Sequence, residues 1–426
     1  MTPSEIAKWA KIKGIGLVGT SDWTHPLWLR ELRASLEEAG QGVYCLRSTD
    51  YGLGKERNRV WFILSTELSC IYKQSGKLRK VHLLVLAPSF EVVEKINKEL
   101  LKKGFNLTSD GRPIMGISAK GLTEIILGVD ENCLIIPAHC WTPHFSVYGS
   151  IGGFDSIEEC FGEYEKYIYA VETGLSSNPS MNWRVKDLAQ RNVVSFSDAH
   201  SAAKMGREAT VFELPEVSYK SVREALTGPV ETSSRHPFIA YTVEFYPEEG
   251  KYHYTGHRNH NIRYSPEDVS KKGTACPVCG KELTVGVANR VEALAGETEN
   301  VKRENDEYGV RWVCDPDNKR PPFVMLVPLL EILSEALEYG TSSKKVVNEY
   351  ENITKHLGTE FDILLRTKTE EIERVSGPKV REALEKVRAG KIFIDPGYDG
   401  VFGIVKIWED QGKKLAVSKD EQMGLF

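Results

Sequence analysis

Six short apolar runs occur in the first half of the chain and are separated by stretches with helical periodicity. They are Gly14–Gly19, Val60–Leu64, Val81–Ala87, Cys133–Pro137, Ile168–Val171 and Val193–Phe196. Short apolar runs that alternate with amphipathic helices are typical of βα units. The first 215 or so residues therefore predict an α/β domain. In a βα barrel the carboxyl ends of the strands meet on one face, where functional side chains gather.

An acidic or histidine side chain follows five of these runs and lies inside the third. In chain order these side chains are Asp22, Glu67, His82, His139, Glu172, Asp198 and His200. Carboxylates and imidazoles together favour zinc, manganese or iron over calcium. Two or three such ions activate water and clamp the oxygens of a phosphate ester. The set predicts a metal-dependent hydrolase, although Asp22 alone is also compatible with a helix cap and His82 with a core histidine.

Composition excludes several classes of protein. The 426 residues are 41% apolar and 27% charged, with a net charge of −5, which is typical of a soluble protein of two or three domains. No run approaches the roughly 20 apolar residues of a membrane span, and no export signal opens the chain. Scattered cysteines fit reduced thiols, so we expect a cytoplasmic protein without membrane contact. Any DNA contact needs a local basic patch or metal-bridged phosphates.

A second metal site is indicated by two short motifs near residue 265. His257-x2-His260 is followed, after 15 residues, by Cys276-x2-Cys279. This spacing is typical of a tetrahedral structural zinc site, and four protein ligands leave no open position for catalysis. The alternative is a reduced cysteine pair beside unrelated histidines. Cys314 and His253 are substitutes if one of the four ligands is misassigned.

Composition and periodicity divide the chain into four parts. We expect a metal-hydrolase domain at 1–230, a zinc-binding module at 246–320, an α+β domain at 321–410 and a flexible tail at 411–426. The expected helices begin with one at Pro3, where Thr2 and Glu5 form a capping box. The others are Pro26–Ala39, Glu91–Lys103, Leu326–Leu337 and Lys379–Arg388, and a strand is expected at Val401–Trp408.

Two features near the C-terminus suggest partners. A predicted helix and its exit carry five cations, which would neutralise DNA phosphates: Lys379, Arg381, Lys386, Arg388 and Lys391. Interleaved Glu382 and Glu385 are equally consistent with an ordinary solvated face. The last residues, with Gln422, Leu425 and Phe426, resemble the peptide with which bacterial DNA enzymes bind the sliding clamp. The alternative is a tail that docks on its own domain.

Several segments carry a resemblance to a known family. They read GTSDWTHP, STELS, KVHLL, AHCWTP, ETGLSSNPSMNWR and SDAHSAAKMGREA, and the likeness continues through CPVCGK and PGYDGVFG to about residue 408. This series resembles the PHP-domain proteins and, among them, the endonuclease Q family. The resemblance implies a distorted PHP-type (β/α)7 barrel that holds two or three divalent ions of zinc, manganese or magnesium.

The same resemblance implies a lesion-specific endonuclease. It would hydrolyse DNA on the 5′ side of uracil, hypoxanthine or an abasic site, with the damaged nucleotide everted from the stack. The implied ligands are Glu67, His82, His139, Asp198 and His200, with Asp22 as an addition; Glu67, Asp198 and His200 would be the catalytic residues.

The chain departs from the family pattern at several positions. PHP proteins open with a strand that carries His-x-His, and none precedes Asp22, so we expect a late start or a truncated version without that strand. A chain that truly begins at Met1 would bind metal weakly and cut little. His144 stands where the family has Trp, and His260 where relatives tend to have Cys. His25 is a weak additional ligand candidate.

Two other functions remain open at this stage. A PHP phosphoesterase for a small phosphorylated substrate would use the same ligands, but would not need the zinc module and C-terminal domain. A catalytically weakened DNA-binding scaffold becomes attractive if the His-x-His strand is truly absent.

Overall fold

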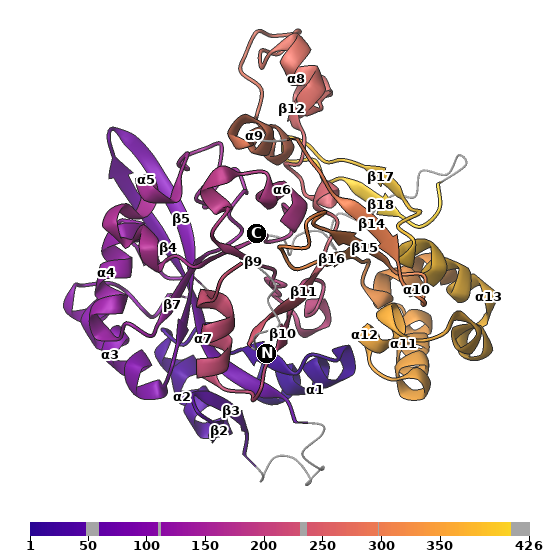
Figure 1. The fold of residues 1–426 in the computed structure, drawn as a ribbon, viewed down its shortest axis with the longest axis horizontal. Coiled ribbons are helices and arrows are strands. Elements are labelled where there is room, and N and C mark those ends of the chain that lie inside the picture. The colour runs from indigo at the N-terminus through magenta and orange to yellow at the C-terminus, as the bar shows by residue number, and fades with distance from the viewer. Residues whose placement is uncertain (48–58, 110–111, 231–236, 297, 410–426) are drawn as a thin grey trace.

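The computed structural model describes residues 1–47, 59–109, 112–230, 237–296 and 298–409. These residues form a mixed α/β structure (Figure 1). Among them, no helix has both the length and the apolar character that a membrane span requires. The helices are α1 (Pro3–Lys13), α2 (Pro26–Ser35), α3 (Phe90–Lys102), α4 (Ala119–Val129), α5 (Ile157–Phe161), α6 (Pro179–Trp183), α7 (Tyr219–Thr227), α8 (Pro266–Lys272), α9 (Val287–Leu294), α10 (Leu329–Leu337), α11 (Lys344–Leu357), α12 (Glu360–Leu365) and α13 (Thr369–Arg388).

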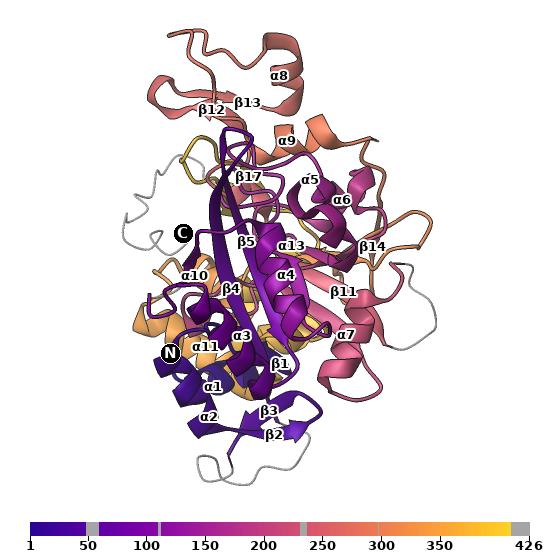
Figure 2. The same cartoon turned by 90° about the vertical axis from the view of Figure 1, so that its left-hand side faces the viewer.

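The N-terminal half is built on a seven-stranded sheet in the order β2-β3-β4-β5-β7, with β1 and β6 both parallel to β4. Its buried side is the apolar core that α3 and α4 help to cover (Figure 2). The strands are β1 (Leu17–Gly19), β2 (Leu36–Gly40), β3 (Val43–Leu46), β4 (Trp61–Gln74), β5 (Lys77–Ala87), β6 (Ile114–Met115) and β7 (Leu134–Pro137).

The two longest strands, β4 and β5, form an antiparallel hairpin, and β7 is antiparallel to β5. The expectation of parallel βα strands is therefore wrong for β4, β5 and β7, which carry or precede Glu67, His82 and His139. Glu67 lies in the middle of β4, because the strand continues beyond the apolar run while Leu68 and Cys70 remain buried. The apolar pattern is interrupted at Ser65, Thr66 and Glu67, but these residues still pair with β5.

The remaining predicted strands form a separate parallel pair, β8 (Ala170–Glu172) and β9 (Asn192–Val194). No closed ring of hydrogen-bonded strands is present within the described ranges. The mixed α/β class is thus confirmed, whereas closure into a (β/α)7 barrel stays a prediction.

A five-stranded sheet in the order β10-β11-β16-β15-β14 joins the two halves of the chain. Its central strand, β16, pairs with β11, and β11 pairs with β10 at the end of the N-terminal half. Helices α10 to α13 pack on this sheet around a second apolar core. The strands are β10 (Ala209–Glu213), β11 (Phe238–Glu244), β14 (Lys302–Asn305), β15 (Arg311–Cys314) and β16 (Phe323–Met325).

The expected zinc-binding module is divided by the fold. β14 and β15 belong to the five-stranded sheet, whereas β12 (Thr255–His257), β13 (Ile262–Tyr264) and α8 form an arm that projects from the body (Figure 1). The arm contains few buried apolar residues, of which Leu283 is one. An arm of this size lacks an adequate core of its own.

All five predicted helices are present, most of them with shifted ends. The capping box of Thr2 and Glu5 begins α1 as expected. The predicted helix Pro26–Ala39 ends early at Ser35, because the following residues pair with β3 as strand β2. The predicted strand at Val401–Trp408 is shorter, β18 (Ile404–Lys406), and pairs with β17 (Phe393–Asp395).

Candidate metal centre and the adjoining pocket

Glu67, His82 and His139 form a compact group in the N-terminal half. Their ligand atoms all lie within 4.8 Å of one another. Ser69 is paired with His82 across the β4–β5 ladder, so Glu67 is two residues along on the same face. His139 reaches the group from the loop after β7. One carboxylate and two imidazoles of this kind suit zinc, manganese or iron.

The Glu67 carboxylate joins the two rings. Its Oε1 lies 2.9 Å from Nδ1 of His82 and 3.2 Å from Nε2 of His139. The two imidazole nitrogens are themselves 3.1 Å apart. Glu67 and His82 from one hairpin and His139 from a later loop therefore form a possible metal site.

The protonation states of Glu67 and His82 suit metal binding. Burial lowers the pKa of His82 to about 4, although Glu67 acts in the opposite direction. Burial acts to raise the pKa of Glu67, yet hydrogen bonds from His139 and His82 hold it well below its usual range. For His139, burial acts to lower the pKa, but Glu67 outweighs it and the pKa is raised. An ionised carboxylate and a neutral imidazole are the forms that bind metal ions.

Arg112, which the sequence interpretation missed, connects this group to Asp198. Its Nε lies 2.7 Å from Oε2 of Glu67, and its Nη2 lies 2.6 Å from Oδ1 of Asp198. The guanidinium thus lies between two carboxylates, as a bound cation would. No motif surrounds Arg112 in the sequence, so only the fold could have identified it.

Like Asp198, the predicted ligands His200 and Asp22 are not members of the group formed by Glu67, His82 and His139. Nδ1 of His200 is 3.9 Å from the Asp198 carboxylate and 3.1 Å from the Asp198 backbone carbonyl, and its ring is half exposed. Asp22 is partly buried and has a close polar contact with its surroundings. Neither residue belongs to a group of three or more candidate ligands among the described residues.

Backbone strain is concentrated around this site. Asp22, His139 and Asp198 have φ values of 41°, 31° and 41°, and Leu175 has a φ of 58°. Left-handed conformations of non-glycine residues cost free energy and cluster where function requires an unusual side-chain direction. The strain therefore supports a functional role for the loops that carry the candidate ligands.

Glu172, at the end of β8, holds His139 in its strained conformation. The backbone N–H of His139 donates to Oε2 of Glu172 at 2.8 Å. Gly174 has a φ of 59°, and a Cβ at this position would lie 2.2 Å from Cβ of His139. Burial raises the pKa of Glu172 to about 8. Glu172 is therefore a positioning residue rather than a member of the ligand group.

Two further buried carboxyl groups, which the sequence interpretation also missed, lie behind Glu172. Glu208 accepts hydrogen bonds from the backbone N–H groups of Leu175 and Phe245. Glu244 is fully buried and accepts hydrogen bonds from the hydroxyl groups of Ser195 and Thr242. Burial raises the pKa of Glu244 to about 7 and that of Glu208 well above its usual range, with the Glu244 charge as a second cause.

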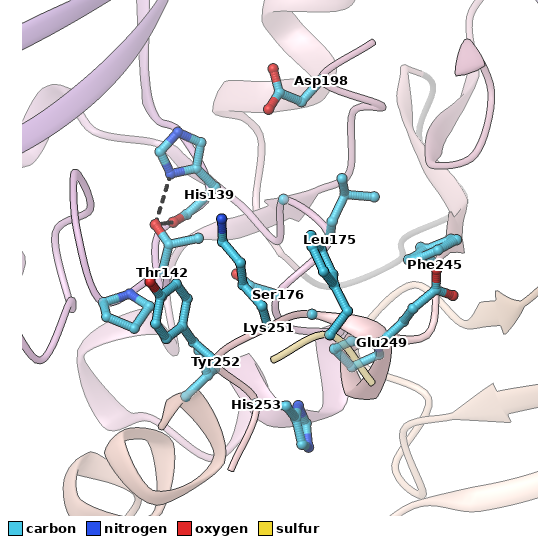
Figure 3. A pocket seen from close by; sticks show the side chains of 16 residues that line it. His139, Thr142, Leu175, Ser176, Asp198, Phe245, Glu249, Lys251, Tyr252 and His253 are labelled. Carbon is cyan, nitrogen blue, oxygen red and sulfur yellow. Dashed lines mark hydrogen bonds between the residues drawn. The ribbon is translucent and has the colours of Figure 1, made fainter. Parts of the chain in front are cut away.

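A pocket opens beside the metal centre and is shown in Figure 3. His139 and Asp198 line one side, and the buried His253 lies at the opposite end from Asp198. The Lys251 side chain points into the pocket, towards the side of His139 and Thr142. The apolar part of the wall comes from Leu175, Phe245, Tyr252, Val287 and Phe402. A concave site with apolar walls and a few polar groups beside a metal centre is the usual form of a ligand site.

The projecting arm brings together the four predicted zinc ligands. The ligand atoms of His257, His260, Cys276 and Cys279 lie within 4.8 Å of one another. Burial acts to raise the pKa of Cys276, but hydrogen bonds from the backbone N–H groups of Cys279 and Val278 and from His260 lower it to about 7. Neither Cys314 nor His253, named above as substitutes, belongs to this group. The set fits a tetrahedral zinc ion.

The basic residues of α13 lie in different environments. Arg381 forms ion pairs with Glu373 and Glu385, and Nζ of Lys379 lies 3.8 Å from the centre of the Trp408 ring. Lys391 is exposed beyond the end of the helix. A DNA contact by Lys379, Arg381 and Lys391 therefore stays a proposal.

Arg388 requires a correction. Its side chain is 1% exposed, and its guanidinium donates to the carbonyl groups of Tyr308, Ile363, Leu364 and Thr367. The guanidinium therefore serves the protein interior rather than a phosphate. Arg388 follows the buried Leu384 by one helical turn, a spacing that could have indicated burial from the sequence.

The predicted clamp-binding residues Gln422, Leu425 and Phe426 lie outside the described residues.

Two solved structures are similar to this chain over almost its whole length. One is the lesion-specific endonuclease PfuEndoQ from Pyrococcus furiosus, with a TM-score of 0.77 and 29% identity over 97% of this chain and 93% of that one. The other is endonuclease Q in complex with a 27-mer duplex substrate that has an abasic lesion at the active site. Its TM-score is 0.77, with 29% identity over 96% of this chain and 92% of that one.

Sequence comparisons find two uncharacterized relatives. Protein YqxK of Bacillus subtilis is 29% identical over 92% of this chain and 89% of its own length. Protein MJ0043 of Methanocaldococcus jannaschii is 32% identical over 62% of this chain, but the match spans only 31% of MJ0043. Residues 328–391 match the model of the MJ0043 C-terminal domain. The chain is therefore a structural homologue of endonuclease Q that contains an MJ0043 C-terminal domain.

Proposed function

We propose that this chain is an endonuclease that uses divalent metal ions to hydrolyse a DNA phosphodiester on the 5′ side of a damaged nucleotide. The observation that carries the proposal is the gathering of Glu67, His82 and His139, joined to Asp198 through Arg112, beside a pocket. Its fold is similar to that of an endonuclease crystallised with an abasic lesion at its active site. The damaged nucleotides would be uracil, hypoxanthine or an abasic site.

The residues of the centre fit a divalent cation. They offer two imidazoles and one ionised carboxylate, and the cationic Arg112 lies between Glu67 and Asp198, which shows that this position favours positive charge. A bound divalent ion would supply an activated water and neutralise the phosphoryl oxygens. Glu67, His82 and His139 would hold one ion, and Asp198 and His200 would contribute to a second or third.

Buried carboxyl groups of the protein orient the residues of the metal centre and the pocket. Glu172 fixes the His139 backbone, and Glu208 fixes the backbone of Leu175 and Phe245, both of which line the pocket. The pocket would receive the nucleotide that is everted from the duplex, since eversion costs least at a mispaired or missing base. Arg112 would remain beside the phosphoryl group, where its planar fork suits oxyanions.

Cleavage of defined duplexes tests the proposal. The protein is incubated with manganese or magnesium and with labelled duplexes that contain uracil, hypoxanthine, an abasic site or no lesion. We expect incision 5′ of the lesion, and we expect Asp198→Asn to abolish it. Asp317→Asn is a matched control, because Asp317 is on the surface and pairs only with Lys319 in the described structure.

The other outcomes of this experiment select the alternatives. Hydrolysis of small phosphomonoesters without DNA cleavage would indicate a phosphoesterase. Binding of the duplexes without cleavage under any metal would indicate a DNA-binding scaffold. Full activity of Asp198→Asn would remove Asp198 from the metal centre.

Three subsidiary assignments belong to the same proposal. A structural zinc ion in the arm would be held by His257, His260, Cys276 and Cys279. Lys379, Arg381 and Lys391 would approach DNA phosphates at the C-terminal domain. The terminal peptide with Gln422, Leu425 and Phe426 would bind a sliding clamp. A pull-down of the clamp by the protein with and without its last five residues tests this assignment.

A further inference from the structure

The segment that follows Glu67 along the chain carries positive charges and no acidic residue. From Leu68 to Phe90 the sequence contains no Asp or Glu, although the chain has 60 acidic residues and a net charge of −5. Four cations lie in this segment: Lys73, Lys77, Arg79 and Lys80. The segment contains the second half of β4, the turn and the whole of β5, and its four cations lie near the turn of the hairpin (Figure 2). A local concentration of positive charge is what an acidic protein needs to approach a polyanion.

The pairing of the hairpin divides these cations between its two faces. Residues directly opposite one another in an antiparallel ladder share a face, and successive residues alternate. Lys73 pairs with Leu78, Ile71 with Lys80 and Ser69 with His82. Lys73 and Lys80 therefore lie on the face that carries Glu67 and His82. Lys77 and Arg79 lie on the opposite face.

Lys80 lies next to the metal centre. Its Nζ is 5.0 Å from the centre of the Phe145 ring, and that ring is 4.7 Å from the His82 ring. Lys80 and Lys251 together lower the pKa of His144, after the larger effect of burial, so positive charge gathers at this side of the pocket. Within the described part of the chain, no carboxylate forms an ion pair with Lys80 or Lys73.

Arg79 has a different role. Its guanidinium donates to the carbonyl of Gly153 and lies 4.0 Å from the centre of the Phe154 ring. These contacts attach the opposite face of the hairpin to the loop before α5. The hairpin is thus fixed on one side, while Leu78, on the side of the metal centre, is 48% exposed.

The spacing along this face matches a nucleic-acid backbone. A strand advances by about 3.3 Å per residue, so Lys80 is roughly 7 Å and the Lys73–Leu78 pair roughly 13 Å beyond His82. Phosphates of one DNA strand advance by about 3.4 Å per nucleotide along the helix axis. A strand with its scissile phosphate at the metal centre and its backbone along this face would bring flanking phosphates to these lysines.

We propose that Lys73 and Lys80, on the metal-centre face of the β4–β5 hairpin, bind the phosphates of the DNA strand that flank the cut. This inference rests on the proposed function, because it takes DNA as the substrate. The contacts carry no base information, so they hold damaged and undamaged duplexes alike and orient the strand over the metal centre.

Salt-dependent binding tests the inference. Binding of a labelled duplex with one abasic site is measured between about 50 and 200 mM salt, in an Asp198→Asn background that prevents cutting. Lys73→Gln and Lys80→Gln are compared with Lys77→Gln, which removes the same charge from the opposite face of the same hairpin tip. Thermal unfolding checks that each variant is folded.

We expect Lys73→Gln and Lys80→Gln each to reduce the slope of log affinity against log salt by about one, and Lys77→Gln to leave it unchanged. The loss should be equal for an undamaged duplex. Unchanged slopes for Lys73→Gln and Lys80→Gln, or an equal loss in Lys77→Gln, would overturn the assignment.

The two proposals fail in different ways. Lesion-specific cutting by the parent protein with unchanged slopes would reject the hairpin contact alone. If the parent protein never cuts DNA but Lys73→Gln and Lys80→Gln reduce the salt slope as expected, the nuclease proposal is rejected and the DNA contact is kept. Absence of any DNA binding would reject both.

Discussion

The Arg112 guanidinium and the Asp198 carboxylate lie 2.6 Å apart, although 86 residues separate them in the chain. The same guanidinium contacts Glu67. A cation is thus built into the candidate metal centre by the protein itself, and it compensates two carboxylates that would otherwise repel one another.

Removal of this cation should make stability depend more strongly on metal. In Arg112→Gln without metal, Glu67 and Asp198 lose their partner, and we expect the free energy of unfolding to fall by about 1–3 kcal/mol. Added manganese should then stabilise the variant more than the parent protein. Urea unfolding with EDTA or manganese measures this, and Arg112→Lys is the control that keeps the charge. An identical manganese effect in all three proteins would contradict the prediction.

Lys13 of α1 and Glu360 of α12 form an ion pair with an Nζ–Oε2 distance of 2.7 Å and side chains 2% and 4% exposed. We expect Lys13→Met to lower the free energy of unfolding by about 3–5 kcal/mol, because Glu360 would stay buried without its cation. The double variant Lys13→Met with Glu360→Gln should recover part of this loss. A double variant as unstable as the sum of the single variants would show that the pair is not coupled.

Because the pKa of the buried Glu244 is raised, we expect the free energy of unfolding to fall as the pH rises. Its pKa is raised from 4.5 to about 7 by burial, so the folded state holds the proton more tightly than the unfolded state. The stabilisation is complete below pH 4.5 and is lost as the pH rises through about 7. Glu244→Gln cannot titrate and should show a smaller fall in unfolding free energy between pH 5 and pH 8. Parallel pH profiles for the two proteins would argue against this assignment.

The proposed zinc site of the arm leads to a prediction about metal content. Cys279→Ser should lose one zinc equivalent per chain, because one of the four gathered ligands is removed. Cys314→Ser should keep it, since Cys314 lies in β15 outside the group. Elemental analysis measures the metal, and limited proteolysis of the arm reports its order. Equal zinc contents in the two variants would mean that Cys279 is not a ligand.

Much of the candidate site could be predicted from local signals. Glu67, His82 and His139 stand out because they interrupt or follow apolar runs, and the spacing of His257, His260, Cys276 and Cys279 is itself a motif. The helix ends were less accurate: at Leu36 a β-ladder with β3 replaces the last turn of the predicted helix.

Other parts of the site could not be predicted. Arg112 has no motif, and Glu208 and Glu244 serve the pocket only because β10 and β11 place them behind it. The expected parallel strands around the ligands became an antiparallel β4–β5–β7 arrangement. Arg388 was assigned to DNA, yet the fold uses it to satisfy buried carbonyl groups.

The sequence by itself determined the residue types of both candidate metal sites, the α/β class and the capping box of the first helix, because these depend on side-chain chemistry and short spacings. The tertiary structure alone decided which cation faces Asp198, which carboxyl groups are buried, and which hairpin face carries Lys73 and Lys80. These features depend on strand register and on contacts between distant segments, where a shift of one residue reverses the face on which every side chain lies.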